Sequence, residues 1–180
     1  MMMLPIHSRF PPMTQRIRAR RSPIHGRGVF ALADLAKGDC VVRYRGELIS
    51  HAQADERYGD DGESGHTFLF TLNEQYVVDG NRRGNVARWI NHSCMPNCQA
   101  VIEISAGGDP RRDRILIEAV RDIAAGEEIT YDYGIVLAVP HTAAMKRLWP
   151  CHCGAARCTG TLLKRRRRTE GGHARVECKM

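Results

Sequence analysis

Residues 88 to 98 of this chain read Arg88-Trp89-Ile90-Asn91-His92-Ser93-Cys94-Met95-Pro96-Asn97-Cys98. Three more cysteines follow much later, at positions 151, 153 and 158. A tetrahedral structural zinc ion needs four ligands, and the later group offers only three thiolates. The earlier stretch can supply the fourth. A shared ion would then join the end of the chain to its middle, and the tail would form a wall of whatever site the middle builds.

The cysteines are candidates for a structural zinc site. The best ligand set is Cys94, Cys151, Cys153 and Cys158. Cys40 and Cys98 lack a comparable sequence context, and His152 lies between two other ligands, where its coordination would strain the geometry. The chain has seven cysteines, an odd number that fits metal ligation in a reducing compartment better than a set of disulfides. Spacing alone leaves open the alternative that they are buried free thiols.

Composition predicts one globular domain inside a cell. The chain has 180 residues and 43% hydrophobic residues, enough for a single core. No apolar run approaches the roughly 20 residues of a membrane span. Residues 1–10 also lack the apolar stretch of a secretory signal. We therefore expect an intracellular protein without a membrane partner, cytoplasmic in a bacterium and nuclear or chromatin-associated in a eukaryote or after delivery to a host.

The net charge of +7 comes from the two ends of the chain. Residues 1–22 hold five arginines and no acid, and residues 161–180 hold seven Lys or Arg against two Glu. The stretch between them carries a net charge of −3. A mildly acidic body favours a basic peptide as partner over a phosphate backbone, although the basic ends can contact nucleic acid non-specifically.

Short alternating segments separated by turns predict a mostly β fold with little helix. Strands are expected at 16–20, 29–31, 40–44 with a continuation at 46–49, 67–72, 76–79, 99–104, 114–119 and 128–133. Short helices are expected near 52–58 and 84–90. We expect a disordered N-terminus at 1–15, the folded domain at 16–135, a linker and zinc segment at 136–163, and a basic disordered tail at 164–180.

Three other motifs are ambiguous when each is taken alone. The segment 91–94 fits a capped turn in which His92 is a satisfied core histidine. The segment 131–133 fits a strand with Tyr131 and Tyr133 on one face. The segment 26–28 lacks the third glycine of a dinucleotide-binding loop.

Taken together and in order, these segments resemble the SET-domain protein lysine methyltransferases. Five stretches carry the resemblance: residues 26–31 (GRGVFA), 44–47 (YRGE), 84–98 (GNVARWINHSCMPNC), 127–134 (EEITYDYG) and 151–163, which is similar to a post-SET zinc motif. The resemblance covers residues 16–163. It implies small curved β-sheets with a C-terminal pseudoknot, S-adenosylmethionine as methyl donor with S-adenosylhomocysteine as product, and a lysine of a histone or histone-like basic protein as acceptor.

The resemblance also implies roles for individual residues. Tyr133 is the expected catalytic hydroxyl, Tyr44 lines the lysine channel, and Tyr131 limits the product to mono- or dimethyl-lysine. The cofactor would contact Gly26, Arg27, Gly28, Arg88, Trp89, Asn91, His92, Tyr133 and Leu162. The rival interpretation is a zinc-stabilised module that binds nucleic acid or peptide without catalysis, in which the basic run at 164–168 takes part.

Overall fold

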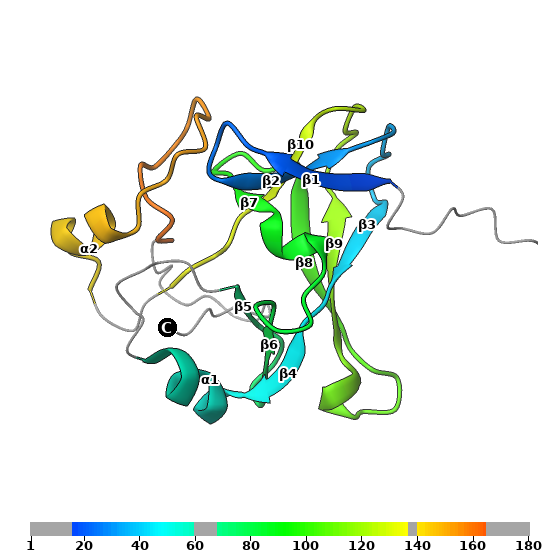
Figure 1. The fold of residues 1–180 in the computed structure, drawn as a ribbon, viewed down its shortest axis with the longest axis vertical. Helices are drawn as coiled ribbons and strands as arrows, with labels where there is room; N and C mark the ends of the chain where they lie inside the picture. Colours follow the sequence, from blue (N-terminus) through cyan, green and yellow to red (C-terminus); the bar gives the residue numbers. More distant parts are fainter. Residues whose placement is uncertain (1–15, 60–67, 137–139, 165–180) are drawn as a thin grey trace, which may run out of the picture.

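Three small β-sheets form the body of the protein, as Figure 1 shows for a computed structural model that describes residues 16–59, 68–136 and 140–164. The first sheet has the order β1 (Ile17–Arg21), β2 (Arg27–Ala31), β10 (Glu128–Tyr131), β7 (Asn91–His92). The second has the order β3 (Cys40–Tyr44), β9 (Arg114–Ala119), β8 (Cys98–Glu103). The third has the order β4 (Glu47–Ser50), β6 (Tyr76–Asp79), β5 (Leu69–Thr71).

Helices are few and short in the described parts of the chain. They are α1 (His51–Tyr58), α2 (Ala143–Leu148), and the 3-10 turns η3 (Val86–Trp89) and η4 (Pro110–Arg112). Ser50 begins α1 with a capping box, in which its hydroxyl accepts from the Gln53 backbone and the Gln53 side chain accepts from the Ser50 backbone. The predicted mostly β fold is confirmed.

The strand β10 joins two distant parts of the chain. It pairs antiparallel with β2 and parallel with β7, with Thr130 opposite Asn91 and Tyr131 opposite His92. The buried side chain of Asn97 accepts from the Thr130 backbone at 2.9 Å and donates to the Glu128 carbonyl at 2.8 Å. The loop after β7 is thereby fastened to β10, which is the contact that the expected pseudoknot requires.

The prediction that residues 46–49 continue the strand at 40–44 is wrong. The strand β4 belongs to a different sheet and pairs with β6. Gly46 lies so close to the backbone of Asp79 and Gly80 that a Cβ atom would overlap them, which marks a chain crossing between sheets. The Asn85 side chain accepts from the Arg45 backbone at 3.2 Å and donates to the Arg43 carbonyl at 2.8 Å, satisfying the backbone where the strand ends.

The residues after β10 fold back against the body. Ile135, Trp149 and Leu163 form a small buried cluster of their own. An isolated bridge pairs Ile135 with Leu163, and Thr161 donates its hydroxyl to the Trp149 carbonyl at 2.9 Å. Figure 1 shows the orange segment on the side of the body where β2 and β7 lie, with α2 farther out.

Three expectations concern residues outside the described parts. The disordered N-terminus at 1–15, the basic tail beyond residue 164 and part of the linker, 137–139, all lie there. Within the described parts, the structure contains no helix of the length and apolarity that crossing a membrane requires.

Candidate functional site

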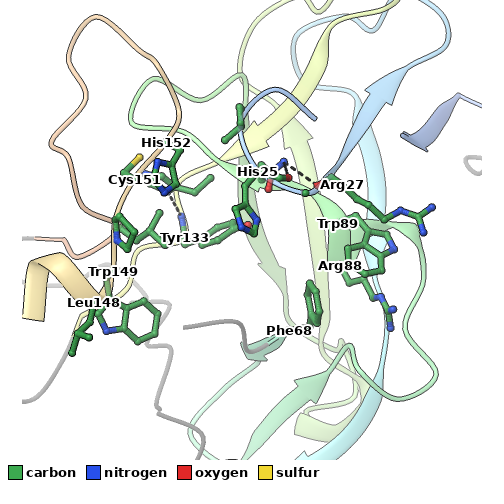
Figure 2. Close-up of a pocket in the computed structure, with 16 residues that line it drawn as sticks. His25, Arg27, Phe68, Arg88, Trp89, Tyr133, Leu148, Trp149, Cys151 and His152 are labelled. Carbon is green, nitrogen blue, oxygen red and sulfur yellow. Dashed lines mark hydrogen bonds between the residues drawn. The ribbon is translucent and has the colours of Figure 1, made fainter. Parts of the chain in front are cut away.

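A cavity of about 560 Å³ lies where three separate parts of the chain meet. The opening loop contributes residues 24–27, and the segment around β7 contributes Arg88, Trp89, Asn91 and His92. The C-terminal segment closes the other side with residues 148–152 and Leu162, and Phe68 and Tyr133 complete the lining. Figure 2 shows the Trp89 and Trp149 side chains on opposite sides of Tyr133.

The opening loop is held in place by the buried side chain of Asn91. Its amide nitrogen donates to the His25 carbonyl at 3.2 Å, the Arg27 carbonyl at 3.0 Å and the Glu128 carboxylate at 2.8 Å. The hydroxyl of Ser22 donates to the same carboxylate at 2.8 Å. The side chain of Asn91 therefore shapes the loop.

The two glycines of the opening loop have different roles. Gly26 lines the cavity and has a φ of +44°, a backbone conformation that favours glycine. Gly28 is buried and is not among the residues that line the cavity. A Cβ atom at Gly28 would overlap the carboxylate of Glu128 and the Cβ atom of Ser22. Gly28 is thus required for packing against Glu128.

Two arginines and two aromatic rings form one side of the cavity. The Arg88 guanidinium lies 4.3 Å from the centre of the Trp89 ring and 5.3 Å from that of Phe68, and the Arg27 guanidinium lies 5.1 Å from Trp89. Phe68 and Trp89 meet edge-on with their centroids 5.0 Å apart. This wall joins two positive charges to a flat apolar surface, which suits a ligand with a carboxylate and a ring system.

Tyr133 is fixed at both its backbone and its hydroxyl. The hydroxyl donates to the Ile90 carbonyl at 2.9 Å, and the backbone N–H donates to Nδ1 of His92 at 3.1 Å. The Tyr133 ring lies 5.0 Å from the ring of Tyr131. Its hydroxyl end is therefore placed against the chain segment that precedes Asn91.

The other two expected catalytic tyrosines lie in the core next to this site. Tyr44 and Tyr131 are buried and do not belong to the cavity lining. The Tyr44 hydroxyl donates to the Phe68 carbonyl at 2.8 Å. The rings of Tyr44 and Tyr131 lie 5.3 Å and 5.9 Å from the ring of Phe70, so both pack against it. They support the cavity from behind, through Phe68 and Tyr133.

Four cysteines that are distant in sequence lie together. The sulfur atoms of Cys94, Cys151, Cys153 and Cys158 are all within 4.8 Å of one another, and Cys94 and Cys151 are 3.8 Å apart. Four sulfurs at the usual zinc–sulfur length of ~2.3 Å in a tetrahedron are ~3.8 Å apart, so the set fits a zinc ion. His152 is not part of this set and lines the cavity.

The cysteine thiols of this cluster have unequal pKa values, and the one that ionises most easily can begin to bind a cation. Burial opposes ionisation of Cys153, but backbone N–H donors of Cys94 and Ala155 and the neighbouring thiols lower its pKa to about 6. Burial, together with hydrogen bonds to the other thiols, raises the pKa of Cys151. One thiolate forms readily, and a bound divalent cation would supply the charge that lets the others ionise.

Several cavity residues were not among those expected from the sequence. They are Ile24, His25, Phe68, Leu148, Trp149, Pro150 and His152. The sequence offered one signal for Trp149, which is that tryptophan is rare in this chain and occurs only twice. Both tryptophans line the cavity. Apart from Gly28, the expected cofactor residues all lie in the lining.

Comparison with known proteins agrees with this arrangement. The SET-domain family profile matches residues 26–134. A Schizosaccharomyces pombe protein named histone-lysine N-methyltransferase, H3 lysine-4 specific, is 43% identical over 144 residues, which is 78% of this chain and 14% of that protein. The Drosophila virilis histone-lysine N-methyltransferase trithorax is 41% identical over 140 residues, 77% of this chain and 3% of that protein. The chain thus spans a small part of the length of these relatives.

A solved structure of ctPRC2 in an autoinhibited conformation bound to S-adenosylmethionine aligns with a TM-score of 0.60 and 35% identity. The alignment covers 66% of this chain and 15% of that one. The profile match includes Gly26 and Arg27 of the opening loop, the Asn91 segment and Tyr133, which all line the cavity, whereas the C-terminal segment that closes it lies outside the match. The chain belongs to the SET-domain family.

Proposed function

We propose that the chain is an S-adenosylmethionine-dependent protein-lysine N-methyltransferase that releases S-adenosylhomocysteine and acts on a histone or histone-like basic protein. The observation that carries the proposal is the cavity in which the opening loop, the Asn91–His92 segment and Tyr133 meet under the cysteine-held C-terminal segment. The names of the relatives and the S-adenosylmethionine bound to the solved structure support it.

The cavity can prepare a lysine amine for methylation. The bound donor supplies an electrophilic methyl group, and the amine must be neutral to accept it, although the pKa of lysine in water is about 10.4. Apolar walls such as Trp149 and Leu162 exclude water and so disfavour the charged ammonium. The hydroxyl of Tyr133 donates its own proton to Ile90, so toward a substrate amine it acts as an acceptor that orients the nitrogen.

The cavity lining also suggests where the donor lies. We assign the cationic side of the cavity, Arg27 and Arg88 around Trp89, to its carboxylate, because these guanidinium groups are the positive charges of that wall. Gly26 gives the backbone of the opening loop access to the ligand. The segment 91–92 contacts both that loop and Tyr133, because Asn91 donates to the His25 carbonyl and His92 accepts from the Tyr133 backbone. Leu162 and Trp149 would close over the adenine from the C-terminal side.

The charge of the chain indicates the kind of substrate, and Tyr131 indicates the degree of methylation of the product. The body of the chain is mildly acidic, which suits a basic peptide. Histone H3 lysine 4 is the first acceptor to test, because the fungal relative carries that name. A histone substrate would place the chain at chromatin. Tyr131, buried beside Tyr133, is expected to limit the product to mono- or dimethyl-lysine because its hydroxyl occupies space.

The test uses labelled donor and recombinant histones with the zinc-loaded protein. Transfer of label to lysine is expected for the wild type, and Tyr133→Phe should lower the rate by about 100-fold through loss of the orienting hydroxyl. Tyr76→Phe is the matched control, because Tyr76 packs against the core and does not line the cavity. Equal rates in wild type and Tyr133→Phe would contradict the assigned role of the hydroxyl.

The non-catalytic alternative predicts a different result. A nucleic-acid module would show no labelled lysine and a binding constant that falls steeply with salt. The position of Tyr133 in the cavity lining disfavours that alternative.

A further inference from the structure

His92 lies between the cysteine cluster and Tyr133. Its side chain is 6% exposed, and both ring nitrogens have partners within the protein. Nδ1 is 3.1 Å from the backbone nitrogen of Tyr133, and Nε2 is 3.5 Å from the sulfur of Cys94. Cys94 belongs to the candidate zinc site, so one imidazole touches both that site and the residue assigned to catalysis.

The two contacts determine where the imidazole carries its proton. The Tyr133 N–H is a donor, so Nδ1 must offer a lone pair. A neutral imidazole then carries its hydrogen on Nε2, which points at the Cys94 sulfur. A metal-bound thiolate is a good acceptor for such an N–H group, so the hydrogen-bond chain runs in one direction, from Tyr133 through His92 to the cysteine.

The surroundings favour this neutral form. Asp132 has a carboxylate oxygen 3.8 Å from Nδ1, but that carboxylate also pairs with Lys164 at 2.8 Å. The hydrogen that an imidazolium would carry on Nδ1 would also face the Tyr133 N–H.

We propose that His92 is a positioning residue that couples occupancy of the metal site at Cys94 to the placement of Tyr133. The catalytic consequence rests on the proposed function, whereas the coupling itself does not. When the metal holds Cys94, the Nε2–H bond fixes the imidazole, and the imidazole fixes the Tyr133 backbone. The Tyr133 hydroxyl donates to the carbonyl of Ile90, two residues before His92. A shift of the His92 imidazole moves the Tyr133 backbone and therefore also moves the Tyr133 hydroxyl relative to the cavity.

Two substitutions separate the two contacts of the His92 bridge, by which we mean its contact with Cys94 and its contact with the Tyr133 backbone. His92→Asn keeps an acceptor near the position of Nδ1 and loses the reach to Cys94. His92→Gln keeps a donor near the position of Nε2 and loses the acceptor for the Tyr133 N–H. His51→Asn is the matched control, because His51 bonds the Asn73 carbonyl at 3.0 Å in the other half of the fold.

The first measurement is amide hydrogen exchange of the whole chain, with zinc and after chelation, without donor or substrate. In the wild type and in His51→Asn, chelation should speed exchange of the Tyr133 amide by about tenfold, because its acceptor loses its anchor. The Thr130 amide, which bonds Asn97, should change little and serves as the internal reference. In His92→Asn, the Tyr133 amide should respond to chelation by less than about threefold, because that bridge no longer reaches the metal.

The second measurement needs no chelation. With cadmium-113 in place of zinc, nitrogen NMR should show the Nε2–H tautomer of His92 and a scalar coupling from that proton to the metal. An Nδ1–H tautomer, or an equal response of the Tyr133 amide in wild type and His92→Asn, would overturn the coupling. Coupling without any methyl transfer would instead leave the bridge standing and reject the proposed activity.

Discussion

Replacing Gly28 by alanine tests whether this glycine is needed for packing against Glu128. The backbone at Gly28 does not have a positive φ, so alanine fits the conformation itself. The added Cβ, however, would occupy the space that the Glu128 carboxylate and the Ser22 side chain now fill. The carboxylate must move, and it then loses its donors.

The size of the effect follows from those donors. The single hydrogen of the Ser22 hydroxyl is shared between both carboxylate oxygens, at 2.8 and 2.9 Å, and the Asn91 amide donates to one of them at 2.8 Å, which makes two hydrogen bonds. Each hydrogen bond to a charged group contributes about 1.5–3 kcal/mol. Glu128 is half-buried, so water can replace part of this. We expect Gly28→Ala to lower the free energy of unfolding by about 3 kcal/mol, which corresponds to a fall in Tm of about 10 °C.

Denaturant unfolding of the zinc-loaded protein measures the change, and Gly107→Ala is the control. An added Cβ at Gly107 meets no heavy atom of the described residues within 4 Å, so this variant should stay within about 0.5 kcal/mol of wild type. Glu128→Asp should partly restore Gly28→Ala, because its shorter side chain withdraws the carboxylate. Equal stability of Gly28→Ala and Gly107→Ala would refute the packing argument.

Three further predictions concern product, pH and metal. Tyr131→Phe removes a buried hydroxyl beside Tyr133 and should shift mass spectra of product peptides toward higher methylation; an unchanged product pattern would argue against the space limit. The hydrogen bond from Arg121 lowers the pKa of Glu127, so the ion pair stabilises the fold above the usual carboxyl pKa of about 4.3 and loses this effect as pH falls through the lower native value. Glu127→Gln should therefore be less stable than wild type at pH 7, with the two unfolding curves converging below about pH 4; a constant difference would exclude this cause. Cys94→Ser should abolish stoichiometric zinc binding and weaken S-adenosylmethionine binding in calorimetry by at least about tenfold, because the C-terminal wall of the cavity loses its anchor, whereas Cys40→Ser should bind both normally.

Much of the framework follows from local sequence patterns. The strands at 40–44 and 114–119 were predicted to the residue, because each is a short run rich in Val, Ile or Leu bounded by polar and turn-forming residues, which is a local property of the sequence. The grouping of Cys94, Cys151, Cys153 and Cys158, whose sulfur atoms lie within 4.8 Å of one another, was also predicted from residue type and spacing, because the coordination number of zinc limits the possible combinations.

The sequence by itself determined the mostly β character, the short turns and the residue types that can bind a metal, since these depend on neighbours along the chain. Only the tertiary structure decided that β4 belongs to a different sheet from β3, that the Asn91 side chain holds the opening loop, and that Gly28 leaves space for the Glu128 carboxylate. It also decided that Trp149 faces Trp89 across the cavity and that His92 bridges Cys94 and Tyr133. Apart from the contact of His92 with Cys94, these contacts join residues dozens of positions apart, and no local propensity encodes them, because they arise when three sheets and the C-terminal segment pack together.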